Sequence, residues 1–375
     1  MKIGLLTTSF PRREGDLAGS FVLGFARAFT RLGHQVQVLC PEPAHGEAPR
    51  FDGLDVHWVR YLPRRLEHTF YGAGVLDNLR RAPWTALGLA PFVAALARDA
   101  RRFQWDAVVS HWALPCALVA PRGIPHLAVC HSADVFALEQ LPRSLSELIA
   151  RGADAMVFSS RDLRKRFLAR LPPLASAAIA QRAHVCPMGI DPALPEPDSR
   201  AALNLSGPTA LTMSRLVPIK GLQYAIEAVR GTRWTLAIAG EGPERAKLAA
   251  LAGPNVRFLG KLGGAVKTRW LSAADALLVP SIPLASGRTE GMPTAILEAM
   301  DHGLPVIASD TGGIGDVVHH GEDGLLVPPR DAQAIARALE QVTAAMAQAA
   351  RETAAQYHWD TLAPRFEALL SSEPH

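Results

Sequence analysis

The chain has 375 residues, of which 49% are hydrophobic and 20% are charged. This length is enough for two domains with cores of their own, and the composition is typical of a globular rather than a disordered protein. The formal net charge of +4 is a modest bias that suits an anionic substrate or an anionic membrane surface. Nucleic acid is disfavoured as a partner, because the sequence carries no basic stripe interleaved with aromatic residues.

The sequence favours a cytoplasmic protein. The four cysteines are far apart and form no CxxC pair, which predicts reduced thiols rather than a disulfide framework or a zinc cluster. The first apolar run, Ile3–Phe10, is too short for a signal peptide. The longest uncharged stretch, Ala82–Ala97, contains two prolines and is too short to span a bilayer. We therefore expect no integral membrane segment.

The N-terminal half alternates apolar runs of strand length with segments of helical periodicity, the pattern of a βαβ fold. The predicted buried strands are Lys2–Ser9, Gln35–Cys40, Asp106–Ser110, Ile124–Cys130 and Ala153–Phe158. Gly53–Val59 is interpreted as an edge strand or a hairpin, and Ser20–Leu32 and Thr85–Phe103 as helices. Between the first strand and that helix, Gly15 and Gly19 would let the backbone approach a ligand, although the loop is not a GxGxxG fingerprint.

Two histidines directly follow predicted strands of this half. His111 comes after one strand and His131 after the next, so both are expected at the carboxyl edge of the sheet, where open α/β sheets bind ligands. A single histidine there is as compatible with a structural role as with a functional one. We favour His131 as the functional residue, because Asp134 follows closely enough to orient its imidazole.

Two basic segments are candidates for contact with an anionic membrane surface. Arg60–Arg81 mixes five arginines with large apolar residues, and Asp162–Leu171 is a basic helix. Amphipathic basic segments bind such surfaces. For the first segment a variable surface loop is an equally good interpretation, and the second is more simply a solvated helix face.

After a proline-marked linker that begins at Pro192, the alternation of strands and helices starts again. The predicted strands of this half are Thr209–Met213, Trp234–Ala239, Val256–Leu259, Ala276–Val279, Pro305–Ala308 and Leu325–Val327. The chain ends with predicted helices at Ala332–Glu340, Ala345–Ala355 and Thr361–Leu370. The sequence thus predicts the α/β class, with two doubly wound domains.

Charged residues gather in two loops of the second half. Arg215 and Lys220 share the loop after the first strand, and two cations beside a helix N-terminus suit a diphosphate leaving group when no metal is present. Glu290 lies in the loop before a helix that Pro293 is expected to open, and Glu298 lies on that helix. Eight residues at helical rise span about 12 Å, roughly the span from a hexose to the ribose of a sugar nucleotide. The alternative is a capping glutamate followed by a solvated one.

Taken together, these stretches resemble the retaining glycosyltransferases of family 4, which have the two-domain GT-B fold. The resemblance is carried by Ser214–Gly221, Ala239–Pro243, Val256–Gly260, Glu290–Met300 and Gly303–Gly313. Glu290 and Glu298 fit the family's E-x7-E element. The sequence departs from the family pattern at Ser132, where glycine is frequent, and at Met188, where asparagine is usual. The resemblance implies two Rossmann-like domains facing each other across a cleft. Residues 1–190 would bind the acceptor and residues 191–356 the donor, with the terminal helix, 357–375, packed back onto the first domain.

The resemblance also implies a role for each candidate site residue. Arg215 and Lys220 would hold the donor diphosphate, Glu290 the hydroxyls of the transferred sugar near the reacting centre, and Glu298 the ribose. The remaining donor contacts would come from the backbone of Gly291, Met292, Pro293 and Thr294, from Gly19 in the first loop, and from His131 oriented by Asp134.

The resemblance implies transfer of a hexose from a nucleotide-diphosphate sugar to an acceptor, with retention of the anomeric configuration and with no cofactor or metal. The expected acceptor is a lipid-linked or cell-surface polysaccharide intermediate, reached by a cytoplasmic enzyme at the inner face of the membrane. Two alternatives share the fold: a sugar-nucleotide 2-epimerase and a catalytically silent sugar-nucleotide-binding protein. A nicotinamide oxidoreductase is disfavoured by the missing glycine pattern.

Overall fold

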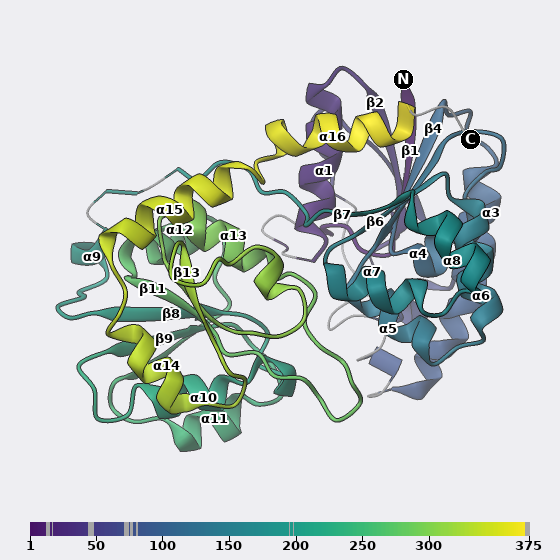
Figure 1. The fold of residues 1–375 in the computed structure, drawn as a ribbon. Coiled ribbons are helices and arrows are strands. Elements are labelled where there is room, and N and C mark those ends of the chain that lie inside the picture. Colours follow the sequence, from purple (N-terminus) through teal and green to yellow (C-terminus); the bar gives the residue numbers. More distant parts are fainter. Residues whose placement is uncertain are drawn as a thin grey trace. The chain divides into compact units, whose positions relative to one another are not determined.

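The computed structural model describes residues 1–12, 16, 18–43, 49–70, 75, 78–79, 82–194, 196–197 and 199–371. The chain divides into two compact units (Figure 1), one formed by Met1–Gly189 with Trp359–His375 and the other by Ile190–His358. Each unit is built on a parallel sheet covered by helices. The predicted fold class, two doubly wound α/β domains, is therefore confirmed.

The first unit holds a seven-stranded sheet of order β3-β2-β1-β4-β5-β6-β7. Its strands are β1 (Lys2–Leu6), β2 (Gln35–Pro41), β3 (Asp55–Val59), β4 (Ala107–His111), β5 (His126–Cys130), β6 (Ala155–Phe158) and β7 (Ala183–Val185). Every residue of β4 and of β5 is buried, as expected for parallel strands covered on both faces. β3 pairs in parallel with β2, so the hairpin interpretation of Gly53–Val59 was wrong and the edge strand was right.

The helices of this unit are shorter and more broken than the periodicity suggests. They are α1 (Ser20–Arg31), η1 (Arg64–Leu66), η2 (Pro83–Gly88), α3 (Leu89–Ala100), α4 (Ala113–Cys116), η3 (Ala117–Val119), α5 (Ser132–Glu139), α6 (Arg143–Gly152), α7 (Arg161–Leu168), α8 (Pro173–Ala180) and α16 (Trp359–Ser371). α1 buries Val22, Phe25 and Phe29 at helical spacing.

The second unit holds a six-stranded sheet of order β10-β9-β8-β11-β12-β13. Its strands are β8 (Thr209–Met213), β9 (Thr235–Ala239), β10 (Val256–Gly260), β11 (Ala276–Val279), β12 (Val306–Ser309) and β13 (Gly324–Val327). Its helices are α9 (Ser199–Ala202), η4 (Pro218–Lys220), α10 (Leu222–Ala228), α11 (Arg245–Leu251), α12 (Gly264–Ala273), α13 (Thr294–Asp301), η5 (Ile314–Asp316), α14 (Ala332–Leu339) and α15 (Ala344–Ala355). Figure 1 shows α12, α13 and α15 on one face of this sheet and α10, α11 and α14 on the other, each set over its own apolar cluster.

The last helix, α16, packs against α1 in the first unit. Trp359 at its start is 1% exposed and meets Phe25 edge-on with ring centroids 5.7 Å apart. A side chain at Gly24 or at Gly189 would collide with the Trp359 indole. Farther along the helix, Glu367 accepts a 2.8 Å contact from the ring of His34. The end of the chain is thus anchored in the core of the unit that its beginning forms.

None of the helices in the described part of the chain is both long enough and apolar enough to cross a bilayer.

Candidate active site

The best-defined cluster of charge in the second unit lies where the strand order reverses. β8 lies beside β11, with earlier strands on one side and later strands on the other, and such a switch point is where open α/β sheets bind ligands. Lys220 ends the short helix after β8, and Glu290 lies in the loop after β11. Lys220 Nζ is 3.0 Å from Glu290 Oε1, and the two side chains are only 15% and 12% exposed. The structure thus brings together two of the predicted site residues.

Two glycines with positive φ hold this pair in place. At Gly221, φ is +58° and a Cβ atom would collide with the carbonyl oxygen of Pro280; at Gly312, φ is +61° and a Cβ atom would collide with the carbonyl oxygen of Glu290. The next residue, Gly313, donates its N–H to Gly291 O at 3.0 Å. Only glycine permits this close backbone approach at a left-handed conformation. The backbone of the loop carrying Glu290 is therefore held by contacts with the loop that follows the neighbouring strand, β12.

The N-terminus of α13 follows this loop and is open to an anion. The helix begins at Thr294, and its N-cap, Pro293, makes no side-chain capping hydrogen bond; the first turn carries no acidic residue. The first amide groups of a helix that lack side-chain caps attract anions, with the helix dipole adding to the effect. Pro293 was expected at the first helical position and instead caps it. Because proline has no N–H, it can contribute no amide to a phosphate cradle.

Glu298 does not share the cation of Glu290. Its Oε1 lies 2.6 Å from Lys267 Nζ on α12, with the side chains 30% and 22% exposed. Lys267 had no part in the sequence prediction, because it is 31 positions from Glu298 and carries no motif. The two glutamates of the E-x7-E element are therefore each paired with a separate lysine.

Arg215 lies on the loop after β8 and is exposed. The next residue, Leu216, donates its N–H to Glu241 O at 2.8 Å and accepts from Glu244 N at 3.1 Å. These bonds tie the loops after β8 and β9 together at the carboxyl edge of the sheet. The structure therefore places Arg215 at the predicted edge, on the same loop as Lys220.

In the first unit, His131 lies against a second histidine. His131 Nε2 is 3.2 Å from His111 Nδ1, and the rings are nearly parallel with centroids 5.5 Å apart. Burial lowers the pKa of His131 to about 3. Burial, with the neighbouring His131 adding to it, lowers the pKa of His111 well below its usual value. At neutral pH both rings are therefore uncharged, so they can exchange hydrogen bonds with a sugar but cannot neutralise a phosphate.

Asp134 acts on the backbone rather than on the imidazole. Its Oδ1 accepts from His131 N at 2.8 Å and from Val135 N at 3.2 Å, while its Oδ2 is buried and has no hydrogen-bond partner. The prediction that Asp134 orients the His131 ring was wrong; the carboxylate caps the first turn of α5, as an acidic residue at this position commonly does. Burial raises the pKa of Asp134 to about 7.

The surroundings of His131 include two aromatic residues that sequence reasoning missed. The ring of Trp112 lies 4.7 Å from that of His131, and the ring of Phe21 lies 5.1 Å away on α1. Gly19, one of the predicted residues, caps α1 with φ +71°, where a side chain would collide with the backbone of Ser9. In the sequence, only the His111-Trp112 dipeptide after a buried strand indicated that aromatic residues pack around His131.

The basic helix predicted as a possible membrane patch is used mostly within its own unit. On α7, Arg166 bonds Asp162 and Glu139, and its guanidinium also lies over the Phe136 ring. Arg164 donates to two carbonyl oxygens, Nε at 2.8 Å and Nη2 at 2.7 Å. Arg164 and Arg166 are therefore engaged within the unit, whereas the predicted alternative to a membrane patch was a solvated helix face. The other basic segment, Arg60–Arg81, lies partly outside the described residues.

Among the described residues, no group of three or more His, Cys, Asp or Glu side chains is placed to hold a metal ion.

Comparison with known proteins identifies the relatives of this chain. The family model Glycosyltransferase Family 4 matches residues 18–194, and the model Glycosyl transferases group 1 matches residues 207–345. A GDP-mannose-dependent alpha-(1-6)-phosphatidylinositol monomannoside mannosyltransferase of Mycobacterium tuberculosis is 32% identical over 409 residues, covering 99% of this chain and 98% of the relative. A putative colanic acid biosynthesis glycosyltransferase of Escherichia coli is 27% identical and covers 90% of each chain.

Solved structures agree on the fold. Sucrose-phosphate synthase from Thermosynechococcus elongatus superimposes with a TM-score of 0.77 at 20% identity, over 98% of both chains. HepE of Anabaena, solved in complex with UDP-glucose, gives 0.70 at 20% identity, over 99% of this chain and 100% of that one. With both family models and a full-length relative in agreement, this chain is a glycosyltransferase of family 4, with the GT-B fold.

Proposed function

We propose that this enzyme transfers a hexose from a nucleotide-diphosphate sugar with retention of the anomeric configuration and without a metal. The observation that carries the proposal is the Lys220–Glu290 pair, 3.0 Å apart and largely buried, at the carboxyl edge of the six-stranded sheet beside the N-terminus of α13. A cation for a phosphate and a carboxylate for sugar hydroxyls then lie within one hydrogen bond of each other, as the junction between a hexose and a diphosphate requires.

The reaction requires stabilisation of the charge that develops on the leaving group more than it requires a strong acid or base. As the bond from the anomeric carbon to the diphosphate breaks, negative charge grows on the leaving oxygen and the sugar becomes oxocarbenium-like. Lys220 can donate to a phosphate while it still touches Glu290, because an ammonium group has three N–H donors. Arg215 and the first amides of α13 would share the growing charge, and Glu290 would accept from sugar hydroxyls. Glu298 would accept from the ribose.

In this proposal the uncharged histidine pair, His111 and His131, contributes to binding of the transferred sugar. An uncharged imidazole both donates and accepts, so His131 would contact a sugar hydroxyl, with Gly19 allowing the first loop to approach the donor. No carboxylate is assigned as a nucleophile, and we therefore favour attack by the acceptor from the face that the leaving group departs, with a diphosphate oxygen taking the acceptor's proton.

The relatives suggest which substrates to test first. The mycobacterial relative is named for GDP-mannose and for a phosphatidylinositol monomannoside, and other relatives are named for the biosynthesis of amylovoran and of colanic acid. We propose a lipid-linked or polysaccharide acceptor, reached by a cytoplasmic enzyme that binds peripherally to the inner membrane face. The exposed apolar residues of η2, Trp84 at 49% and Leu87 at 75%, suit contact with such a surface.

The test is a transfer assay in EDTA with GDP-mannose, UDP-glucose, ADP-glucose and a dTDP-sugar, each supplied with a mannosylated phosphatidylinositol and with the lipid-linked glycans of a bacterial extract. We expect transfer from one donor, with NMR of the product showing the same anomeric configuration as the donor. An inverted product would overturn retention, and activity only after adding a divalent cation would overturn metal independence. Interconversion of the donor without any acceptor would indicate an epimerase.

A further inference from the structure

A large cavity lies in the first unit at the carboxyl edge of the sheet. Its volume is about 810 Å³, within the usual range for small-molecule sites. Thr8 and Ser9, which follow β1, form part of its wall together with Trp112 and Pro115, which follow β4. β1 and β4 are neighbours at the point where the strand order of this sheet reverses. The cavity therefore occupies the crevice where open α/β sheets bind ligands.

Most of the cavity wall is apolar, and much of it comes from a second apolar face of α3. Leu89, Ala90, Val93, Ala94 and Ala97 line the cavity, while Phe92 and Leu96, on the adjoining stripe of the helix, are fully buried in the core. A helix that packs on a sheet with one face normally presents polar residues on the other. Here the stripe beside the core-facing one is apolar as well, and the residues described around it leave its side chains partly or fully exposed, which indicates an apolar ligand.

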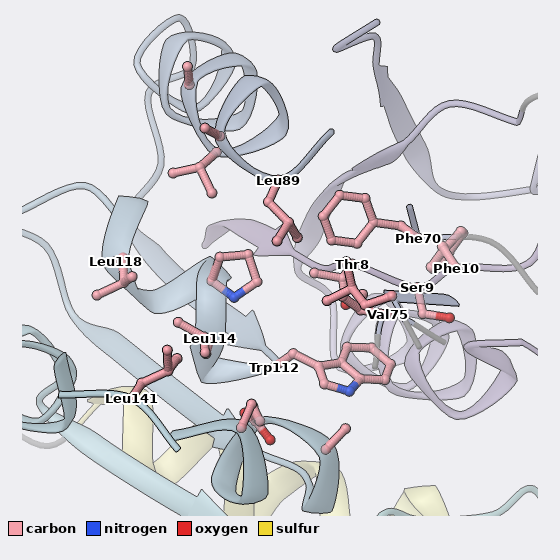
Figure 2. Close-up of a pocket in the computed structure, with 18 of the residues that line it drawn as sticks. Thr8, Ser9, Phe10, Phe70, Val75, Leu89, Trp112, Leu114, Leu118 and Leu141 are labelled. Carbon is pink, nitrogen blue, oxygen red and sulfur yellow. The ribbon is translucent and has the colours of Figure 1, made fainter. Parts of the chain in front are cut away.

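The cavity wall has a few polar groups among its apolar residues. Figure 2 shows Thr8 and Ser9 on the same side as Phe10, Phe70, Val75 and Trp112, and Leu114, Leu118 and Leu141 on the other side. Asp134 also lines the cavity; it is 3% exposed, and its Oδ2 has no hydrogen-bond partner. A buried carboxylate oxygen without a donor is costly, and a ligand hydroxyl would satisfy it. The cavity wall therefore favours a ligand that has an apolar body and a hydroxyl group at one end.

The hydroxyl-bearing end would lie close to the residues proposed to handle the sugar. Trp112 lines the cavity and also packs on the His131 ring, with centroids 4.7 Å apart. Asp134 bonds the backbone of His131 at 2.8 Å. At the other side, Leu141 is 40% exposed, so an apolar chain could continue from the cavity out of the protein.

From this geometry we propose that the cavity holds the hydrocarbon chain of a lipid-linked acceptor, with Asp134 Oδ2 accepting a hydrogen bond from a hydroxyl of the acceptor's head group. The inference deepens the proposed function and rests on it, because it assigns the acceptor a chain-binding subsite. Unlike the proposed function alone, it predicts that the affinity for the acceptor depends on the length of the hydrocarbon chain. This dependence would arise from residues that do not touch the donor.

The first test is the binding of n-alkyl glucosides with chains of four to ten carbons, below their micelle concentrations, by titration calorimetry on the whole protein. Each buried methylene is expected to tighten binding about fourfold, until the chain fills the cavity. Ala97→Phe places a ring in the cavity and should abolish the chain-length dependence. Ala178→Phe, on an exposed face of α8, is the matched control and should bind as the wild type does. Affinity independent of chain length, or equal loss in both variants, would overturn the inference.

Trp112 gives a second readout that needs no cavity-filling variant. A chain brominated near its end should quench tryptophan fluorescence, and Trp112→Phe should remove the largest share of that quenching although six other tryptophans remain of the seven. Quenching unchanged in Trp112→Phe would contradict the cavity as the site.

Donor binding separates this inference from the proposed function. Nucleotide-sugar binding should be the same in Ala97→Phe as in the wild type. If a nucleotide sugar binds the wild type and chain length has no effect, the chain subsite is wrong and the proposed function stands. If no nucleotide sugar binds at all while chains do, the proposed function is the part that fails.

Discussion

The carboxyl edges of the two sheets have the same topology and opposite chemistry. In the six-stranded unit, two lysines and two glutamates form two ion pairs, Lys220–Glu290 at 3.0 Å and Lys267–Glu298 at 2.6 Å. In the seven-stranded unit, the edge carries an uncharged histidine pair, a buried aspartate and a large apolar cavity. Both groups of residues lie at switch points of doubly wound sheets. The fold supplies the location, and the side chains decide what binds there.

This contrast suggests a division of labour within the transferase. Ion pairs next to a helix N-terminus suit the charged part of a sugar nucleotide, since phosphate prefers cations and amide groups. The crevice of the first unit is lined mostly by apolar residues, with Arg12 and Asp134 as its charged lining residues, and it therefore favours a ligand that is mostly apolar. A substitution at one edge should therefore change the function assigned to that edge, and a matched control substitution should not.

The largest effect is expected from Lys220→Ala. Removing a positioned donor from a site of developing charge costs about 10² to 10³ in turnover, and the loss should appear in kcat for transfer with circular dichroism unchanged. Lys267→Ala, the other lysine of the same edge, is the matched control and should lose less than tenfold, because Lys267 is not proposed to touch the diphosphate. Near wild-type turnover in Lys220→Ala would remove that residue from the diphosphate site.

The next effect in size is expected from Gly312→Ala. The added methyl group must displace the backbone of Glu290 and also strains a φ of +61°, so we expect a loss of roughly 1–3 kcal/mol in the free energy of unfolding together with weaker donor binding. Gly321→Ala is the control, because Gly321 has φ +85° and no atom within 4 Å of the added methyl group. It should cost stability without affecting the donor. Equal effects of the two changes on donor binding would show that Gly312 does not position Glu290.

A smaller, pH-dependent effect is expected at the edge of the seven-stranded sheet. Burial raises the pKa of Asp134 to about 7, so the folded state binds a proton there more tightly than the unfolded state does. Its contribution to stability is present below the carboxyl group's ordinary pKa and is lost as pH rises to about 7, by roughly 1 kcal/mol per pH unit. Asp134→Asn keeps an oxygen to cap α5 and removes the titration. In urea unfolding between pH 4.5 and 7.5, the wild type should therefore lose stability relative to Asp134→Asn as pH rises.

A constant difference between the two proteins across this range would contradict the raised pKa of Asp134. His131 contributes with the opposite sign, because its pKa is lowered to about 3 by burial and its stabilising contribution is lost as pH falls. This contribution is common to both proteins and should cancel in the comparison.

The sequence was most informative where local pattern and burial agree. Thr209–Met213 and Ala276–Val279 were predicted as strands with the bounds that the structure shows, because short apolar runs between turn residues have few other interpretations in an α/β chain. Thr85–Phe103 was predicted as one helix and is a 3-10 helix followed by α3. Apolar residues of α3 lie both in the core and along the cavity. The hydrophobic periodicity of the sequence does not distinguish these two locations.

The sequence identified residues of the candidate site but did not predict which side chains contact one another there. Motif spacing located Lys220 and Glu290, yet the partners Lys267 and His111 come from distant elements, and only tertiary packing brings them to their sites. The role of Asp134 was misjudged for a local reason. Three residues after His131, its carboxylate reaches the backbone N–H of that residue more readily than the ring.

The most direct test of the charged edge as the donor site is a thermal-shift measurement in EDTA with UDP-, GDP-, ADP- and dTDP-sugars, on the wild type and on Lys220→Ala. Binding to the folded state raises the melting temperature with ligand concentration. We predict that one nucleotide series stabilises the wild type, and that the shift is lost or strongly reduced in Lys220→Ala. Equal stabilisation of both proteins, or none of the wild type by any donor, would contradict the assignment of the nucleotide sugar to this edge.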